Sequence, residues 1–447
     1  MRPTIVTRRP WMPVLHRIKY RIALSGLPAW LGSDRVQAVL RQVDRIPVRP
    51  FRHRYMPRTG PRSLQIPELP EAWKGEPGVP RDRTAAEADI AAHGRPPTFF
   101  KLHHEAFALN LRQKWPMLLG HLTRLGKDVH AAIAERPDEP AVVATRRDPA
   151  DLTAGLKERA AEIGFSAIGI TAPDLTVTYS DQDLLPHERH VVVCVLEPSW
   201  EATQAIPGRI GENTEFATVF RLRELCLELA DHLNALGYRA RIDNPRVGHT
   251  VAYGVEAGLG QLGLNGQLLT PFAGSRGRLS LIFTDAPLVD DGPRDFGVPA
   301  LCDECRVCVP NCPPRAIRSR RDWHHGVYKA AVKPERCFPV VTTFDGCGIC
   351  QKVCPVQRYG LPAVIEEFHA TGRILGKGTD ELEGYWWPGD GRYYGPGQAP
   401  RPDPEMLSPE GFVMDPARTD YAPEVKAQGQ DYYRRRAVGT VEDDDAG

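Results

Sequence analysis

The sequence predicts a mixed α/β domain that is joined to a small cysteine-rich domain. Strand-like and helix-like segments alternate between residues 148 and 284, and eight of the ten cysteines lie between Cys302 and Cys354. A chain of 447 residues has room for two or three domains. Its 42% hydrophobic and 25% charged residues are ordinary for a soluble globular protein, whereas 42 prolines and 40 glycines indicate long irregular segments.

Charge is distributed unevenly along the chain. Residues 1–62 contain fourteen Lys or Arg but only Asp34 and Asp44 as acidic residues, although the net charge of the whole chain is +1. A basic arm of this kind can bind nucleic acid, an anionic membrane surface or an acidic redox partner. Contact with a membrane surface stays open, while we expect no nucleic-acid partner.

The sequence predicts a cytoplasmic protein. No apolar run approaches the length of about eighteen residues that a membrane-spanning helix needs. Residues 7–10 resemble part of a twin-arginine export signal, but residues 14–31 are interrupted by basic side chains and offer no small-residue cleavage site. Helical spacing at 14–24 fits a helix that lies either on the protein or on a membrane surface.

The first two elements of the core follow a poorly patterned N-terminal region. Residues 1–147 are predicted to form a basic arm and a helical region, and residues 148–297 the first folded domain. Asp148 and Pro149 are typical of a helix start, and Gly164 of a helix end. A strand is then expected at 166–170.

The remaining core elements have clear apolar patterns. Residues 190–196 and 278–284 are predicted strands, and residues 215–236 the longest helix, which Gly237 closes. Its stripe consists of Phe216, Val219, Phe220, Cys226, Leu229, Leu233 and Leu236. Cys226 lies in that stripe and Cys194 in a buried strand, so both are expected to be core residues and not metal ligands.

A glycine-rich segment follows the predicted helix. Gly258, Gly260 and Gly263 form a formal G-x-G-x-x-G. A dinucleotide site needs a strand before these glycines and a helix after them. Here Asn265 and Gly266 introduce a turn and a short strand instead, which argues against a Rossmann fold. Close approach of the backbone to a flat ligand would explain the glycines.

The cysteine spacing is that of a bacterial ferredoxin. The first four cysteines form C-x2-C-x2-C-x3-C-P, in which three thiolates hold one [4Fe-4S] cluster and the fourth reaches a second cluster. The motif is made by Cys302, Cys305, Cys308 and Cys312. Cys347, Cys350 and Cys354 repeat its last three positions, but Phe344 stands where the first ligand would be. Cys337 is therefore inferred, by exclusion, to be the missing ligand.

Two clusters with crossed ligand sets are thus predicted within residues 298–360. One set is Cys302, Cys305, Cys308 and Cys354, and the other is Cys312, Cys337, Cys347 and Cys350. Structural zinc would need neither the third close cysteine nor the C-P ending. Disulfides rarely join cysteines two residues apart.

Residues 361–447 are predicted to form a C-terminal extension. It starts with a helix near 361–372, continues through an aromatic and glycine-rich stretch at 385–396, and ends with the acidic residues 442–445. The aromatic residues could cover the clusters, line a pocket or pack over a loop, and packing over a loop is the simplest expectation.

Residues 257–354 resemble the corrinoid-dependent iron-sulfur reductases, meaning the reductive dehalogenases and, more distantly, the epoxyqueuosine reductases. The likeness extends over roughly residues 150–360. It implies a nitroreductase-like corrinoid-binding domain fused to a ferredoxin-like domain with two [4Fe-4S] clusters, and cobalamin bound base-off without a protein ligand to cobalt. The matching residues expected near the corrinoid are Gly258, Gly260, Gly263, Asn265 and Gly266.

The resemblance also suggests two catalytic residues. Gly274-Ser275-Arg276 stands where the family carries Gly-Pro-Arg, so Arg276 is expected on the substrate side of the corrin, where a guanidinium could stabilise a departing halide. The dehalogenases have their proton donor, a tyrosine, near the start of the long helix, and the epoxyqueuosine reductases have an aspartate in a D-Y-H setting. By its place in the chain, Glu215 stands in this position here, with neither pattern. Glu215 is either a general acid or a partner of the helix dipole.

These expectations describe an oxidoreductase for reductive dehalogenation or a related reductive cleavage of a small molecule. Electrons would pass from an external reduced ferredoxin or flavodoxin-type donor through the two clusters to cobalamin. Two alternatives stay open: tRNA modification of the epoxyqueuosine-reductase kind, for which the aspartate motif is missing, and a non-catalytic iron-sulfur electron carrier or corrinoid-binding protein.

Overall fold

The computed structural model describes residues 62–96 and 121–402, except 244–246, 334–335, 338–339, 342–343 and 345. The helix predicted at 14–24 and the acidic C-terminal residues lie outside this described part. Among the described residues, no helix has both the length and the apolar character to cross a bilayer.

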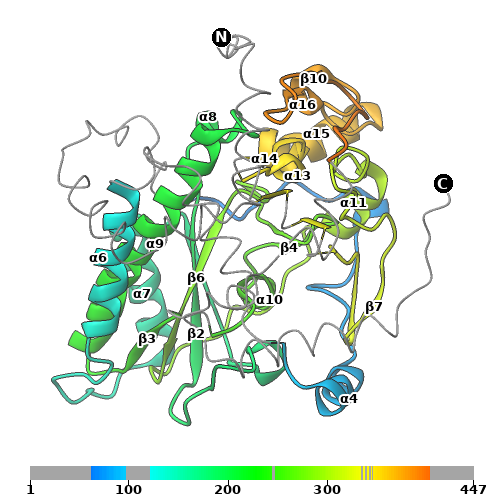
Figure 1. Cartoon of the computed structure of the whole chain (residues 1–447). Coiled ribbons are helices and arrows are strands. Elements are labelled where there is room, and N and C mark those ends of the chain that lie inside the picture. The colour runs from blue at the N-terminus through cyan, green and yellow to red at the C-terminus, as the bar shows by residue number, and fades with distance from the viewer. Residues whose placement is uncertain are drawn as a thin grey trace.

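A four-stranded antiparallel sheet is the centre of the larger domain (Figure 1). Its order is β1-β2-β6-β3, with β1 (Ala167–Thr171), β2 (His190–Leu196), β3 (Ala240–Ile242) and β6 (Arg278–Thr284). β2 and β6 pair along their whole length, from His190 opposite Thr284 to Leu196 opposite Arg278. Both strands have the bounds that the sequence predicts.

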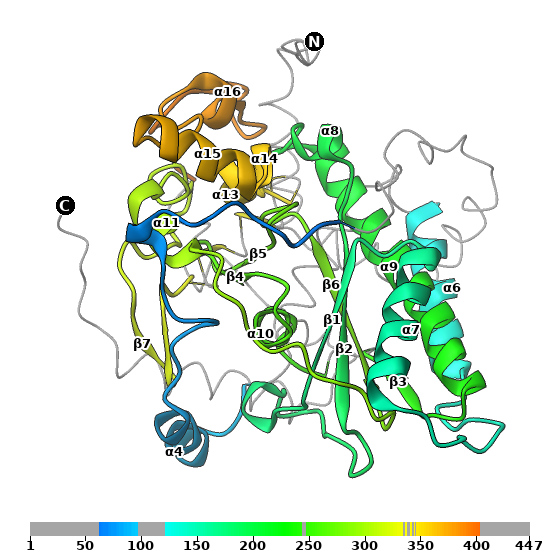
Figure 2. The same cartoon turned by 180° about the vertical axis from the view of Figure 1, so that it is seen from behind.

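The two faces of the sheet are covered by different elements, as Figures 1 and 2 show. Helices α6 (His121–Glu135), α7 (Pro149–Ile163) and α9 (Arg209–Ala235) cover one face, and α10 (Thr250–Glu256) covers the other. Because side chains alternate along a strand, Val192 and Cys194 pack with the first group while Val191 and Val193 pack with the second. A strand buried on both faces therefore reads as one apolar run.

The ends of α7 are those that the sequence predicts. The Asp148 carboxylate accepts hydrogen bonds from the backbone N–H groups of Ala150 and Asp151, and Gly164 ends the helix with φ of 109°. α9 begins earlier than predicted, at Arg209. Its first turns lack the apolar stripe because they are polar, and the Thr214 hydroxyl donates to the Ile210 carbonyl.

Cys194 and Cys226 lie in the core between the sheet and α9, with no exposed surface. The prediction that both are core residues is confirmed.

The cysteine-rich domain packs beside the sheet and is built from short elements. They are α11 (Val298–Cys305), the β7–β8 hairpin (Asp322–His324, Val327–Lys329), α13 (Ile349–Lys352), α14 (Pro355–Tyr359) and α15 (Leu361–Thr371). The chain then continues through α16 (Asp380–Glu383), β9 (Tyr385–Trp386) and β10 (Tyr393–Tyr394). α15 is the helix expected near 361–372.

Residues 62–96 link the two domains. This segment contains η2 (Glu71–Trp73) and α4 (Arg83–His93). Trp73 is buried against Phe368 of α15, with ring centroids 4.4 Å apart. Arg81 pairs with Asp174 and Glu256 of the sheet domain. The described end of the N-terminal region is therefore packed on both domains.

Packing between α9 and the sheet should dominate the stability of the larger domain. Leu225 has no exposed surface, whereas Leu227 of the same helix is only partly buried. We expect Leu225→Ala to lower the free energy of unfolding by about 2–5 kcal/mol, because it leaves a cavity. Thermal unfolding followed by circular dichroism measures the effect. Equal melting temperatures for Leu225→Ala and the control Leu227→Ala would contradict this packing.

Candidate metal centre

The structure brings together the four cysteines of the first predicted ligand set, which we call the first tetrad: Cys302, Cys305, Cys308 and Cys354. Burial raises the pKa of the Cys305 thiol to about 12, and the charges of Cys302 and Cys354 add to the shift. Burial likewise raises the pKa of Cys308, and the charges of the three other members and of Cys350 raise it further. Only thiols that lie near one another interact in this way.

The second tetrad, Cys312, Cys337, Cys347 and Cys350, is assembled in the same way. Burial raises the pKa of the Cys347 and Cys350 thiols, and the charges of Cys337 and Cys312 raise it further. The structure thus places Cys337 with the three cysteines whose motif lacks its first ligand. Cys350 also interacts with Cys354, so the two tetrads adjoin.

Backbone N–H groups point at the sulfur atoms. The Ala316 N–H donates to Cys312 Sγ at 3.3 Å. Cys347 has a left-handed backbone with φ of 46°, between two glycines that are also left-handed, and the N–H groups of Gly348 and Ile349 reach its sulfur. Such hydrogen bonds favour the thiolate and set the potential of a bound cluster.

A cavity of about 380 Å³, including its opening to solvent, lies among the cysteines. It is lined by every member of the first tetrad, by Cys350, and by Leu264 and Asn265 from the larger domain. The Asn265 side chain donates to the Cys350 carbonyl at 3.4 Å. The space between the thiols is therefore shared by both domains.

Aromatic residues of the C-terminal extension pack against the second tetrad. Tyr385 is buried, and the pKa of its hydroxyl is raised first by burial and then by the charge of Cys347. The Trp387 ring contacts that of Phe344, with centroids 4.6 Å apart. Phe344 thus fills a packing position where the motif would have a cysteine. The extension covers the cysteines more closely than the simple expectation of packing over a loop.

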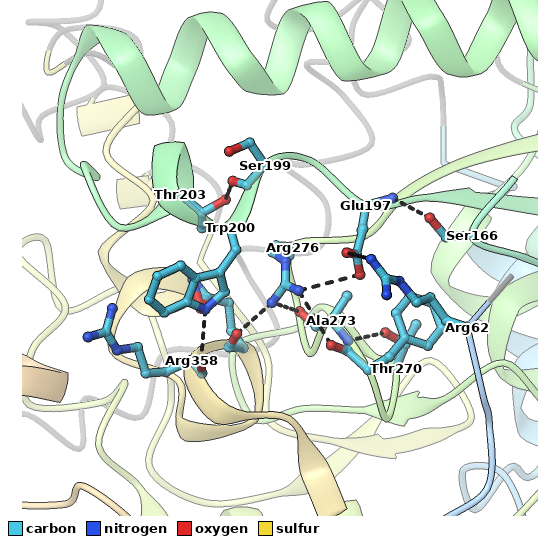
Figure 3. Close-up of polar contacts among 12 residues, drawn as sticks. Arg62, Ser166, Glu197, Ser199, Trp200, Thr203, Thr270, Ala273, Arg276 and Arg358 are labelled. Atoms are coloured by element: carbon cyan, nitrogen blue, oxygen red, sulfur yellow. Dashed lines mark hydrogen bonds and ion pairs between the residues drawn. The ribbon is translucent and has the colours of Figure 1, made fainter. Parts of the chain in front are cut away.

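Arg276 is buried between the two domains (Figure 3). Its guanidinium donates to the Gln357 carbonyl at 2.6 Å and to the Glu197 carboxylate at 3.4 Å. Glu197, which is also buried, accepts a second hydrogen bond from Arg62 at 2.9 Å. The structure therefore gives Arg276 partners within the protein, and its role toward a substrate stays a prediction.

Glu215 contacts the cysteine-rich domain through Gln351, the residue that follows Cys350 of the second tetrad. Its carboxylate forms a close ion pair with Arg278 and accepts a hydrogen bond from the Gln351 side chain at 2.8 Å. Burial lowers the pKa of Arg278 to about 10. A neighbouring guanidinium favours the carboxylate over the neutral acid, so this geometry suits a hydrogen-bonding role, and the general-acid role stays a prediction.

Close contacts within the protein explain why the three positions of this motif are glycine. A Cβ atom at Gly258 would collide with the Gly292 carbonyl, and one at Gly260 with the Leu269 carbonyl. At Gly263 it would collide with the Leu269 side chain. Leu269 belongs to β5 (Leu268–Leu269), which pairs with β4 (Gln261–Leu262). A role of this motif in holding a flat cofactor stays a prediction.

Sequence reasoning missed Glu197, although one signal pointed to it. The residue directly follows the continuous apolar strand β2, and a charge in that position is either exposed or paired. Its two arginine partners lie in distant segments, so the sequence alone could not reveal them.

Comparison with known proteins identifies the cysteine-rich segment. Residues 301–358 match the family described as a 4Fe-4S dicluster domain. A 149-residue stretch is 35% identical to a tetrachloroethene reductive dehalogenase of Desulfitobacterium hafniense, covering 33% of this chain and 26% of that protein. The dehalogenase of the same name from Sulfurospirillum multivorans is 31% identical over 194 residues, covering 41% of this chain and 39% of that one. These matches span well under half of the relatives.

A third relative is matched over most of its length. An epoxyqueuosine reductase of Synechococcus sp. is 30% identical over 258 residues, which cover 48% of this chain and 78% of that protein. Among solved structures, the catabolic reductive dehalogenase NpRdhA in complex with 3-bromo-4-hydroxybenzoic acid is similar, with a TM-score of 0.58 and 22% identity over 79% of this chain and 54% of that one. Another solved reductive dehalogenase, described as B12-dependent, has a TM-score of 0.57 with 21% identity and the same coverage.

The buried carboxylate of Glu197 should be important for stability. Glu197→Gln keeps the shape but leaves Arg276 without its counter-charge, and we expect a loss of about 3 kcal/mol in the free energy of unfolding. The control Glu162→Gln removes an exposed partner of Arg159 and should cost under about 1 kcal/mol. Urea denaturation measures both variants. A loss at Glu197 no larger than that of the control would refute the buried pair.

Cys337 should be required for one cluster only. Cys337→Ala should lower the iron content of anaerobically loaded protein from about eight atoms per chain to between about four and seven, because the second tetrad loses a ligand. Cys226→Ala, which changes a core cysteine, is the control and should keep all the iron. An unchanged iron content and spectrum in Cys337→Ala would show that another group is the fourth ligand.

Proposed function

Because this chain belongs to the family of oxidoreductases that includes the reductive dehalogenases and the epoxyqueuosine reductases, we propose that it is a corrinoid-dependent iron-sulfur reductase. Two [4Fe-4S] clusters would carry electrons to base-off cobalamin, for reductive dehalogenation or a related reductive cleavage. The observation that carries the proposal is the assembly of eight cysteines into two adjoining tetrads at the boundary with the larger domain.

The tetrads fit two cubane clusters. Each provides four sulfur atoms in surroundings that disfavour bare thiolates, and coordination to iron compensates that cost. Backbone N–H groups already point at several of the sulfurs. Crossing of the ligand sets keeps the two sites close to each other, as electron transfer between them requires.

The seam where the 274–278 loop meets α14 fits a ligand with many polar groups. Ser275 Oγ and Gln357 Nε2 are buried there without hydrogen-bond partners among the described residues, and so is Gln204 Oε1. The seam is held by the hydrogen bond between the side chains of Gln204 and Gln357 at 3.2 Å. Buried polar atoms of this kind are usually paired with a ligand or water, and the amides on the rim of a corrin are suitable partners.

The residues around this seam would position the reacting groups. A bound, reduced corrinoid supplies the reducing power for cleavage of a carbon–halogen or carbon–oxygen bond. Arg276, fixed by Glu197 and the Gln357 carbonyl, keeps a positive charge near the site, which favours a leaving anion. The Gln351 side chain links Glu215 to the cysteine-rich domain. A proton held near the Glu215 carboxylate would therefore lie where the two domains meet.

A second candidate function is epoxyqueuosine reduction in tRNA. It is favoured by the match that covers 78% of the epoxyqueuosine reductase relative. The site has Glu215, paired with Arg278, where that group of enzymes is expected to have an aspartate. The fold likeness to solved dehalogenases extends over 79% of this chain, and we therefore place dehalogenation first.

The electron donor would be a separate protein, a reduced ferredoxin or flavodoxin. Its electrons would enter at the cysteine-rich domain, and the substrate would be a small molecule at the seam. The basic residues 1–61 lie outside the described part of the chain, and contact of this arm with a membrane surface belongs to the same proposal.

Anaerobic loading with iron, sulfide and hydroxocobalamin tests the proposal. We expect about eight irons and about one cobalt per chain, and reductive loss of halide from halogenated phenols or ethenes with reduced methyl viologen as donor. Ser275→Val should lower the cobalt content but keep the iron, because it removes a polar contact at the seam. Iron without cobalt in the unchanged protein would refute the corrinoid, and conversion of epoxyqueuosine to queuosine within tRNA, without dehalogenation, would favour the second candidate.

A further inference from the structure

The loop that crosses the second tetrad is strongly basic. Between residues 311 and 336 the sequence has seven Lys or Arg and only Asp322 and Glu335 as acidic residues. The cations are Arg315, Arg318, Arg320, Arg321, Lys329, Lys333 and Arg336. Arg315 and Arg320 have exposed side chains, whereas Arg321 is paired with Asp303 of α11. Arg315 and Arg320 therefore present positive charge at the surface of this loop.

The base of this loop packs against the cysteines of the second tetrad. Ile317 bridges to Val332 across the loop, and the Lys333 N–H donates to the Ala316 carbonyl at 2.8 Å. Cys312, Ala316 and Ile317 form a small core that packs against Val332, Cys337 and Cys350. The inner face of the loop is thus part of the second tetrad, and its outer face carries the cations.

An exposed aromatic pair adjoins the basic residues. Trp323 of β7 and Tyr328 of β8 are cross-strand partners with ring centroids 5.6 Å apart. They are 52% and 39% exposed, which is unusual for such large side chains. Arginine and aromatic side chains are enriched where proteins bind one another, and here Arg320 stands three residues before Trp323 along the chain.

We propose that the basic surface of residues 311–336 is the docking site of a small acidic ferredoxin that delivers electrons to the second tetrad. The proposal rests on the proposed function, since it requires a redox cluster in that tetrad. Each encounter transfers one electron, so the ferredoxin is oxidised by one electron and the cluster is reduced by one, with no change in covalent bonds. Charge attraction would speed and orient the encounter.

Position distinguishes this partner from nucleic acid. This loop packs on Cys312 and Cys337, whereas the seam between Arg276 and Gln357 is built from other segments of the chain. An acidic redox protein at the same place gains both electrostatic attraction and a short path to the sulfur atoms. The surface therefore suits a carrier of electrons better than a substrate.

The test is the rate at which a reduced acidic ferredoxin reduces the clusters of the loaded, full-length protein in stopped flow. We expect Arg315→Glu and Arg320→Glu each to lower the second-order rate constant by about three- to tenfold at low salt, with the difference shrinking as ionic strength rises. Arg189→Glu reverses an exposed arginine beside β2 and is the matched control, which should react like the unchanged protein. The final extent of reduction by excess dithionite should be equal in all variants.

Binding provides a second readout. Oxidised ferredoxin should bind the unreduced loaded protein more weakly after either reversal, as titration calorimetry would show. Equal ferredoxin rates and affinities in both reversals and the control would overturn the docking site. It would also be overturned if the protein bound an RNA hairpin and not ferredoxin, and if both reversals weakened that RNA binding. Failure of the protein to take up any cluster would instead overturn the proposed function. The dithionite control detects this failure separately, because a protein without clusters shows no reduction.

Discussion

The crossing of cysteines between the two halves of the cluster domain is the constraint on which the rest of the structure depends. Cys354, at the start of α14, lies with the cysteines of α11, and Cys312 lies with Cys347 and Cys350. The chain between them is therefore fixed at both ends. Because α14 is held in this way, Gln357 meets the loop that carries Arg276, and the domains share a boundary beside the sulfur atoms.

Burial of the thiols has an energetic consequence. Removal of a thiol from water raises its pKa, as in Cys305 and Cys354, so the protein without metal would hold these groups protonated. Metal binding then releases protons and returns free energy to the fold. Since the cores of α11, α13 and α15 include the same cysteines, the cluster domain should be more stable with its cofactors than without them.

Local patterns in the sequence predicted the parts of the fold that depend on neighbours along the chain. β2 has the predicted bounds because a strand that is buried on both faces is uniformly apolar. β6 has them because residues 279–283 are apolar apart from Ser280, and α7 because Asp148 and Gly164 act within one turn. The grouping of seven cysteines followed from ligand spacing. The partners of Glu197 and Arg276, and the close contacts of Gly260, come from distant segments, so no local pattern could predict them.

The central claim is that two adjoining tetrads hold two cubane clusters within reach of each other. Electron paramagnetic resonance of the fully reduced protein tests it most directly, because two reduced clusters at close range couple magnetically. The account predicts a broadened spectrum of two interacting clusters in the fully reduced protein. Protein that has received only one electron per chain should instead show the signal of one isolated cluster. A single uncoupled signal at full reduction, or no iron signal in a protein that binds only zinc, would contradict it.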